Sequence, residues 1–136
     1  MAPPLLSLIS WLRGLFRRPG ELLEFFGGCA TLGWVVLAWN RGHGAMPSIE
    51  LLARLMPEEC WLWFAGGAAL AQLIALGANQ HIARFIAAIC VGSWYAMLAF
   101  ALSAQLGPAT PMLSMYAMAA AMNAYVVLHV LEGRLR

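Results

Sequence analysis

The chain has 136 residues, of which 62% are hydrophobic and only 10% are charged, and its net charge is +2. Soluble domains carry about 25% charged residues, so this composition is too poor in polar groups to cover a water-soluble fold of this size. The small net charge and the lack of a basic stripe with interleaved aromatic residues argue against nucleic-acid binding. The composition predicts an integral membrane protein that does not bind nucleic acid.

Residues 1–20 are predicted to form an amphipathic helix that lies in the headgroup region. The apolar side chains of residues 4–18 recur with helical spacing, and serine and arginine lie largely on the opposite side. This stretch is too short and too charged to span a bilayer, and its arginines would meet anionic lipid. Pro19 and Gly20 separate it from the next helix. The expected membrane-interface residues here are Trp11, Arg13, Arg17 and Arg18.

Four apolar segments then follow within residues 21–136. The first has 18 residues, or roughly 27 Å of helix, which is near the minimum for a hydrocarbon core of about 30 Å. Glu21 and Glu24 mark its entrance, and the short link 77–81 makes the second and third segments antiparallel neighbours. The sequence thus predicts an all-α, four-helix transmembrane bundle with an N-terminal interfacial helix. The predicted spans are 22–39, 60–76, 82–103 and 112–131.

Between the first two spans, residues 48–56 form a short amphipathic stretch with Ser48 as its N-cap, which we expect to rest on the membrane surface. Tryptophan at the edge of a span is typical of an interface anchor. We therefore expect Trp39, Trp61 and Trp63 to lie at membrane boundaries. Deeper aromatic residues are expected to make core or subunit contacts in which their polar tips find partners: Trp94, Tyr95, Tyr116 and Tyr125.

The distribution of arginine predicts the orientation in the membrane. Cytoplasmic loops of membrane proteins carry an excess of Lys and Arg. If both termini are cytoplasmic, only Arg41 and Arg54 lie outside. All charged residues are Arg or Glu, which together with the abundant Ala and Gly suggests a GC-rich bacterial or phage genome. We expect a bacterial inner membrane protein with these arginines on the cytoplasmic side: Arg13, Arg17, Arg18, Arg84, Arg134 and Arg136.

Small residues at four-residue spacing permit close approach of membrane helices. Gln72 and Asn123 lie deep in two spans, and amides facing lipid would cost several kcal/mol. They are expected to face protein, either in interhelical hydrogen bonds or as the polar lining of a conduit. The residues predicted to pack helices together, within or between subunits, are Gly67, Ala71, Ala75, Ala88, Gly92, Ala96, Gln72 and Asn123.

No nucleophile and base, carboxylate dyad, phosphate loop or zinc spacing is present, so we expect neither catalysis nor a bound metal or cofactor. We expect His81 and His129 to make ordinary interfacial hydrogen bonds, and the alternative is that they ligate a haem. We expect the methionines of the fourth span to pack against neighbouring helices, and the alternative is a relay that binds metal. No ionisable side chain is expected at mid-membrane, which argues against a proton-coupled transporter or a pump.

Small size, several spans, small-residue helix faces and the short basic tail EGRLR together resemble the architecture of phage holins. The resemblance covers the whole chain and carries no functional residue with it. It implies a protein that self-associates in the inner membrane and permeabilises it. The alternative is a structural or accessory subunit of a larger membrane complex. The expected partners are therefore membrane lipids and either further copies of the chain or another membrane protein.

Overall fold

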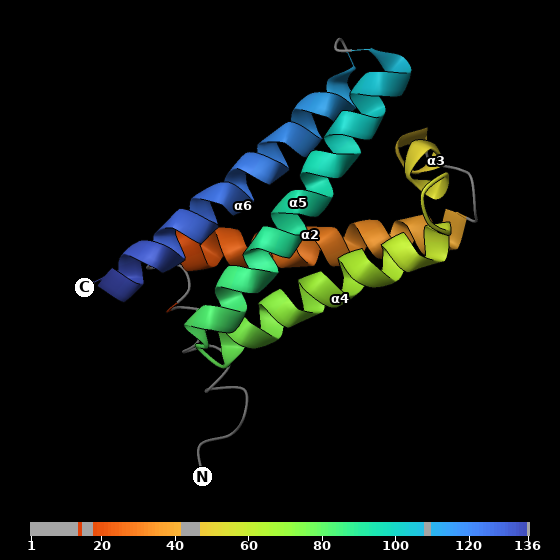
Figure 1. Ribbon diagram of the computed structural model, residues 1–136. Helices are drawn as coiled ribbons and strands as arrows, with labels where there is room; N and C mark the ends of the chain where they lie inside the picture. The colour runs from red at the N-terminus through yellow and green to blue at the C-terminus, as the bar shows by residue number, and fades with distance from the viewer. Residues whose placement is uncertain (1–13, 15–17, 42–46, 108–109, 136) are drawn as a thin grey trace.

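The computed structural model describes Gly14 and residues 18–41, 47–107 and 110–135, and this part of the chain is helical without strands (Figure 1). The prediction of an all-α four-helix bundle is confirmed. The predicted interfacial helix falls mostly outside the described residues. The helices are α2 (Pro19–Arg41), α3 (Pro47–Ala53), α4 (Glu58–Gly77), α5 (His81–Leu106) and α6 (Pro111–Leu135).

The four long helices form two pairs that cross each other. α2 lies beside α4, and α5 and α6 form an antiparallel hairpin (Figure 1). The pairs meet where α2 begins and α6 ends, and they diverge toward the opposite end. α3 lies in the opening between them and packs mainly against α5, with Leu52 only 6% exposed. The stretch expected to rest on the membrane surface is therefore also packed into the bundle.

A tight turn joins α4 to α5. Asn79 has φ 53°, in the left-handed region that asparagine tolerates better than most residues. The backbone N–H of Asn79 donates to the carbonyl of Leu76, and that of Gln80 donates to the carbonyl of Ala75. This pair of hydrogen bonds is the Schellman motif, which satisfies carbonyls at the end of a helix. The turn places the start of α5 beside the end of α4, as the short link predicted.

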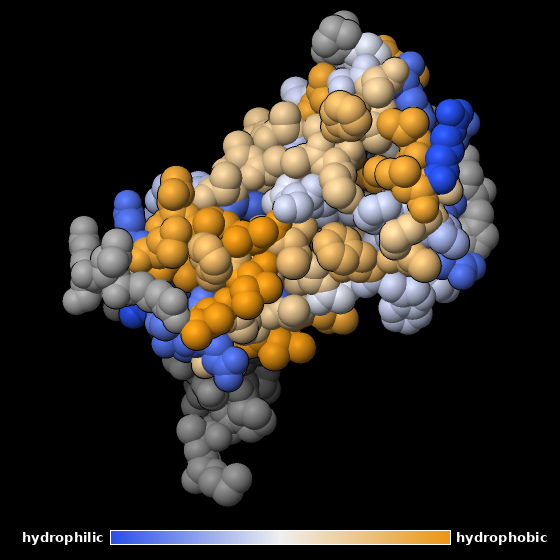
Figure 2. Space-filling model, in the orientation of Figure 1, coloured by the Kyte–Doolittle hydropathy of each residue, from blue (hydrophilic) through white to orange (hydrophobic). Residues whose placement is uncertain are grey.

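The outer surface of the bundle is apolar. Ile74, Phe100 and Met115 are each about 70% exposed, and strongly hydrophilic residues lie mostly toward the two ends (Figure 2). The four long helices have the length and composition of membrane spans. At about 1.5 Å per residue each is roughly 30–39 Å long, enough to cross a hydrocarbon core. The chain is therefore a multi-pass membrane protein with apolar outer faces.

An aromatic cluster around Trp94 fills the core between α2, α4 and α5. The ring centroid of Trp94 lies 5.4 Å from that of Trp34, 6.0 Å from that of Trp61 and 6.5 Å from that of Phe64. The indole N–H of Trp61 donates to the carbonyl of Leu52 at 2.9 Å, which attaches α3 to the cluster. Trp61 is thus half-buried, whereas the other expected anchors, Trp39 and Trp63, are exposed and touch each other edge to face.

The closest approach of α5 to α6 predicts a difference between two glycines. A Cβ on Gly92 would lie 3.1 Å from Cβ of Asn123, whereas a Cβ on Gly67 would meet nothing within 4 Å. Gly92→Leu should therefore force the hairpin apart and lower the free energy of unfolding by about 1–3 kcal/mol. Gly67→Leu should have little effect. Unfolding of both variants in mixed micelles, followed by circular dichroism, checks this, and equal stability of the two would contradict the packing.

Candidate functional site

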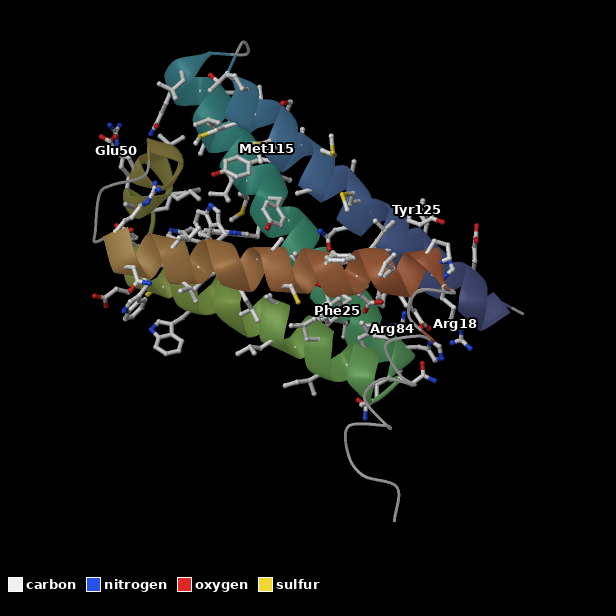
Figure 3. The ribbon with its side chains drawn as sticks, turned by 180° about the vertical axis from the view of Figure 1, so that it is seen from behind. Arg18, Phe25, Glu50, Arg84, Met115 and Tyr125 are labelled. Atoms are coloured by element: carbon white, nitrogen blue, oxygen red, sulfur yellow. The ribbon has the colours of Figure 1, made fainter. Side chains whose placement is uncertain are left out.

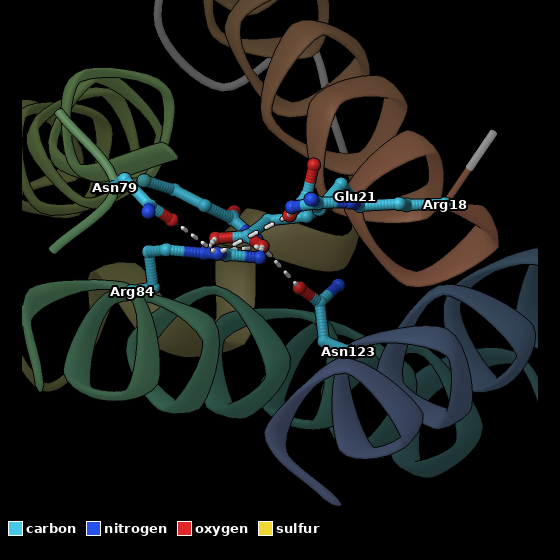
Figure 4. A network of polar contacts seen from close by, with 7 residues as sticks. Arg18, Glu21, Asn79, Arg84 and Asn123 are labelled. Atoms are coloured by element: carbon cyan, nitrogen blue, oxygen red, sulfur yellow. Dashed lines mark hydrogen bonds and ion pairs between the residues drawn. The ribbon is translucent and has the colours of Figure 1, made fainter. Parts of the chain in front are cut away.

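A buried ion pair joins α2 to α5 about one turn inside each helix. Arg84 Nη2 donates to Glu24 Oε2 at 2.7 Å, and Nε lies 3.0 and 3.2 Å from the two carboxylate oxygens (Figure 4). The Glu24 side chain is fully buried and that of Arg84 is 4% exposed. Such a two-point contact between a guanidinium and a carboxylate is the strong form of this interaction. The pair therefore fixes the relative position of two spans.

Further polar groups surround this ion pair at the same end of the molecule. Arg84 Nη1 donates to Asn79 Oδ1 at 3.4 Å and lies 3.7 Å from Glu21 Oε1. Arg18, whose side chain is 68% exposed, pairs with Glu21 at 3.0 Å. Figure 3 shows Arg18 and Arg84 at the end of the molecule opposite to Glu50. Asn79 thus serves two purposes, because its backbone makes the turn and its side chain holds the guanidinium.

The two deep amides contact each other across the interior. Gln72 Nε2 donates to Asn123 Oδ1 at 3.4 Å, and Asn123 Nδ2 donates to the carbonyl of Ala119 at 2.9 Å (Figure 4). Both side chains are buried, and Gln72 Oε1 has no hydrogen-bond partner among the described residues. Gly27 lies next to the Asn123 amide. The structure thus brings together, between α4 and α6, two residues that are far apart in sequence.

Hydroxyl groups continue the polar contacts toward the aromatic cluster. The Thr31 hydroxyl lies 2.8 Å from the carbonyl of Gly27 and 3.0 Å from the hydroxyl of Tyr95. Because Thr31 has one proton to donate, the Tyr95 hydroxyl donates to Thr31 whenever Thr31 donates to Gly27. The indole N–H of Trp34 donates to the hydroxyl of Tyr116 at 3.3 Å. The Tyr95 and Tyr116 hydroxyls therefore form hydrogen bonds between helices.

Trp94 differs from the other deep aromatic residues. Its side chain is fully buried, but its indole N–H finds no acceptor in the part of the chain that the structure describes. Leu98 and Leu102 continue the same face of α5 and are also buried. The centre of the bundle is therefore filled by large side chains.

The outer side of the α5–α6 hairpin carries a shallow groove of about 620 Å³. The predicted small-residue row of the third span contributes to it: Ala88 and Gly92 also pack inward, whereas Ala96 is exposed. The groove is lined by Ala88, Ile89, Gly92, Ser93, Ala96, Ala120, Ala121, Ala124, Val127 and Leu128.

The row predicted on the second span lies elsewhere. Gly67 and Ala71 are exposed on the outer face of α4, and Ala75 is buried within the bundle. Gly67 instead helps to line a smaller apolar pocket of about 300 Å³ between α2 and α4. The three residues of this row therefore do not act together in contacts within the monomer.

A stripe of mostly small residues runs along α6, and three of its members also line the groove. The stripe consists of Ser114, Ala117, Ala121, Ala124 and Leu128, all of them exposed. Their spacing alternates between three and four residues, so they share one face of the helix. The sequence predicts this stripe only in part, because Ala117 with Ala121, or Ala120 with Ala124, forms a weaker small-residue row on the fourth span. Among the described residues, no other helix packs against this face of α6.

The remaining predicted positions comprise three residues that the structure does not describe and two histidines. Trp11, Arg13 and Arg17 fall outside the described residues. His81 and His129 line the same small pocket beside Arg84. Within the described ranges no group of three or more His, Cys, Asp or Glu side chains is arranged to hold a metal ion.

Comparison with known proteins found no relative of this chain. The chain matches no family model, and neither the curated proteins nor the solved structures contain a significant match. The class of the protein therefore rests on its four candidate spans and their packing, which define a multi-pass membrane protein.

The buried ion pair predicts a specific pattern of stabilities. Arg84→Gln should leave the Glu24 carboxylate buried without its partner and destabilise the fold by about 3–5 kcal/mol. Replacing both residues, Glu24→Leu with Arg84→Met, should recover most of that loss. Arg18→Gln, which removes only an exposed pair, should cost about 0–1 kcal/mol. Unfolding of the variants in micelles checks this, and a double variant as unstable as the single one would refute the pairing argument.

Proposed function

We propose that this protein is a non-enzymatic component of the bacterial inner membrane that self-associates through the α5–α6 face and, in a holin-like manner, permeabilises the membrane. The observation that carries the proposal is the exposed stripe on α6 together with the groove beside it. The occupant of this face is a second copy of the same chain.

The small side chains of the stripe favour a helix over lipid as its neighbour. The 3.6-residue period of the helix puts these residues on one face, so together they form a continuous shallow surface. Small side chains also allow the backbones of two membrane helices to approach closely. Only 17% of the most apolar stretch of α6 is buried within the monomer, against 50% for α5. α6 therefore has most of its surface available for a neighbouring copy.

Permeability, on this proposal, arises between copies rather than within one. The interior of each bundle is occupied by the Trp94 cluster and by the hydrogen-bonded pair Gln72 and Asn123. A path for water or ions would therefore require several copies to surround it. This is why self-association is the central test.

The first experiment measures contacts between copies in the membrane. In a chain whose cysteines Cys29, Cys60 and Cys90 are replaced by alanine, Ala117→Cys should form a disulfide between copies under mild oxidation. Ala71→Cys, on the exposed face of α4, is the matched control and should not. Equal cross-linking at both positions would indicate random collision and contradict the proposal.

Membrane potential measured in the same host tests the action. Expression of the chain alone should cause an abrupt depolarisation, reported by a voltage-sensitive dye. Ala121→Leu fills the stripe and should delay or abolish the depolarisation, whereas Ala71→Leu should leave it unchanged. Stable membrane-bound protein without cross-links or depolarisation would instead favour the alternative, an accessory subunit docked on another membrane protein.

The proposed orientation places both termini in the cytoplasm, with the Arg18 and Arg84 end inward. Single cysteines at Gln80 and Arg54, both exposed and at opposite ends, test it in the cysteine-free chain. Before the depolarisation, while the cells still hold their membrane potential, a membrane-impermeant maleimide should label Arg54→Cys but should label Gln80→Cys only after lysis. The reverse pattern would overturn the orientation.

A further inference from the structure

A small pocket lies beside the buried ion pair, at the end of the bundle where α2 and α5 begin and α6 ends. Its volume is about 180 Å³. Because the spans end here, the pocket lies at the level of the lipid headgroups rather than of the hydrocarbon core. Its lining residues belong to α2, α5 and α6, except for Arg18, which directly precedes α2. They are Arg18, Glu21, His81, Arg84, His129, Val130 and Gly133.

Arg84 brings spare hydrogen-bonding capacity to this pocket. Its Nε and Nη2 atoms are held by Glu24 at 2.7–3.2 Å. Among the described residues its Nη1 atom, in contrast, has only the long contacts of 3.4 Å to Asn79 and 3.7 Å to Glu21. The Arg84 side chain is only 4% exposed, so bulk water has little access to accept hydrogen bonds from Nη1. An oxygen anion in the pocket would complete the hydrogen bonding of the guanidinium.

The other groups in the pocket carry both signs of charge. Arg18 is largely exposed and can turn toward a ligand, and the imidazoles of His81 and His129 can donate hydrogen bonds. Glu21 is the one carboxylate of the lining, and Glu24 lies behind Arg84. A ligand that is only anionic would bring its charge close to two carboxylates. A ligand with a phosphate and an ammonium group offers an opposite charge both to the two arginines and to Glu21.

We propose that this pocket binds the headgroup of a phospholipid that carries both a phosphate and a primary ammonium group, as in phosphatidylethanolamine. The phosphate accepts hydrogen bonds from Arg84, Arg18 and the histidines, and the ammonium donates to Glu21. Val130 in the lining provides apolar surface where the headgroup joins the acyl chains. Tyr125, which is 47% exposed and stacks on His129, offers further apolar surface next to the pocket.

Three lipids with identical acyl chains separate the parts of this proposal. Purified protein in detergent is mixed with phosphatidylethanolamine, phosphatidylcholine or phosphatidylglycerol, and bound lipid is counted by native mass spectrometry. We expect phosphatidylethanolamine to bind about tenfold more tightly than the other two, the scale of one hydrogen bond to a charged group. Phosphatidylcholine lacks the N–H donors, and phosphatidylglycerol lacks the positive charge. Equal or tighter binding of phosphatidylglycerol would overturn the zwitterionic site.

Two variants of the pocket and one control variant locate the binding. Glu21→Gln should abolish the preference for phosphatidylethanolamine over phosphatidylcholine, whereas Glu132→Gln, an exposed carboxylate near the same end of α6, should preserve it. Arg18→Gln should weaken binding of all three lipids. Circular dichroism confirms that each variant is folded. A preference that survives Glu21→Gln would place the site elsewhere and refute the proposal.

Two water-soluble competitors distinguish a lipid from a free phosphate compound. Inorganic phosphate and phosphoethanolamine are added at millimolar concentration to the complex with phosphatidylethanolamine. On our proposal neither displaces the lipid, because both lack the apolar part that holds it at the bundle. Displacement by phosphoethanolamine would mean that the pocket serves a soluble phosphoester, and displacement by phosphate would mean a simple anion site. Either result would overturn the assignment to a lipid.

Discussion

The ion pair between Glu24 and Arg84 sets the geometry of this bundle. Two opposite charges buried together must meet with good geometry, because an unpaired charge in an apolar surrounding costs several kcal/mol. The pair accordingly holds α2 and α5 at one crossing point close to their first turns. Asn79, at the end of α4, and Glu21, a turn before Glu24, contact the same guanidinium. The Arg84 side chain therefore joins α2 to α5 and also reaches the turn that follows α4.

Lipid as a solvent explains how the remaining polar groups are used. In a bilayer the hydrophobic effect does not draw helices together, so packing and hydrogen bonds must do it. The Gln72–Asn123 contact joins α4 to α6, and the contacts of Thr31 with Tyr95 and of Trp34 with Tyr116 join α2 to the α5–α6 hairpin. The polar residues of the interior thus act as links between helices, while the outer faces remain apolar.

The spans could be predicted from the sequence because their signal is local. Length and hydropathy place each helix within a few residues of its observed ends, and the short link 77–81 makes α4 and α5 neighbours. The partner of Arg84 could not be predicted in this way. From the sequence alone, a charged residue one turn inside a span cannot be distinguished from a residue at the membrane boundary. The contact of Arg84 with Glu24 depends on how α2 and α5 cross, because the two residues are 60 positions apart in the sequence. Similarly, the sequence predicts Trp61 to be an interface anchor, whereas in the structure its indole N–H donates to α3.

The divergence of the two helix pairs has a consequence for the bilayer. Where α2 begins and α6 ends, the spans are gathered around one guanidinium, and at the other end α3 is inserted between them. The described part of the molecule is therefore wider at one end of its helices than at the other, and a wedge of this kind displaces more lipid from one leaflet of a bilayer than from the other. A crowd of such wedges inserted in the same direction expands one leaflet relative to the other and imposes curvature on the membrane that contains them.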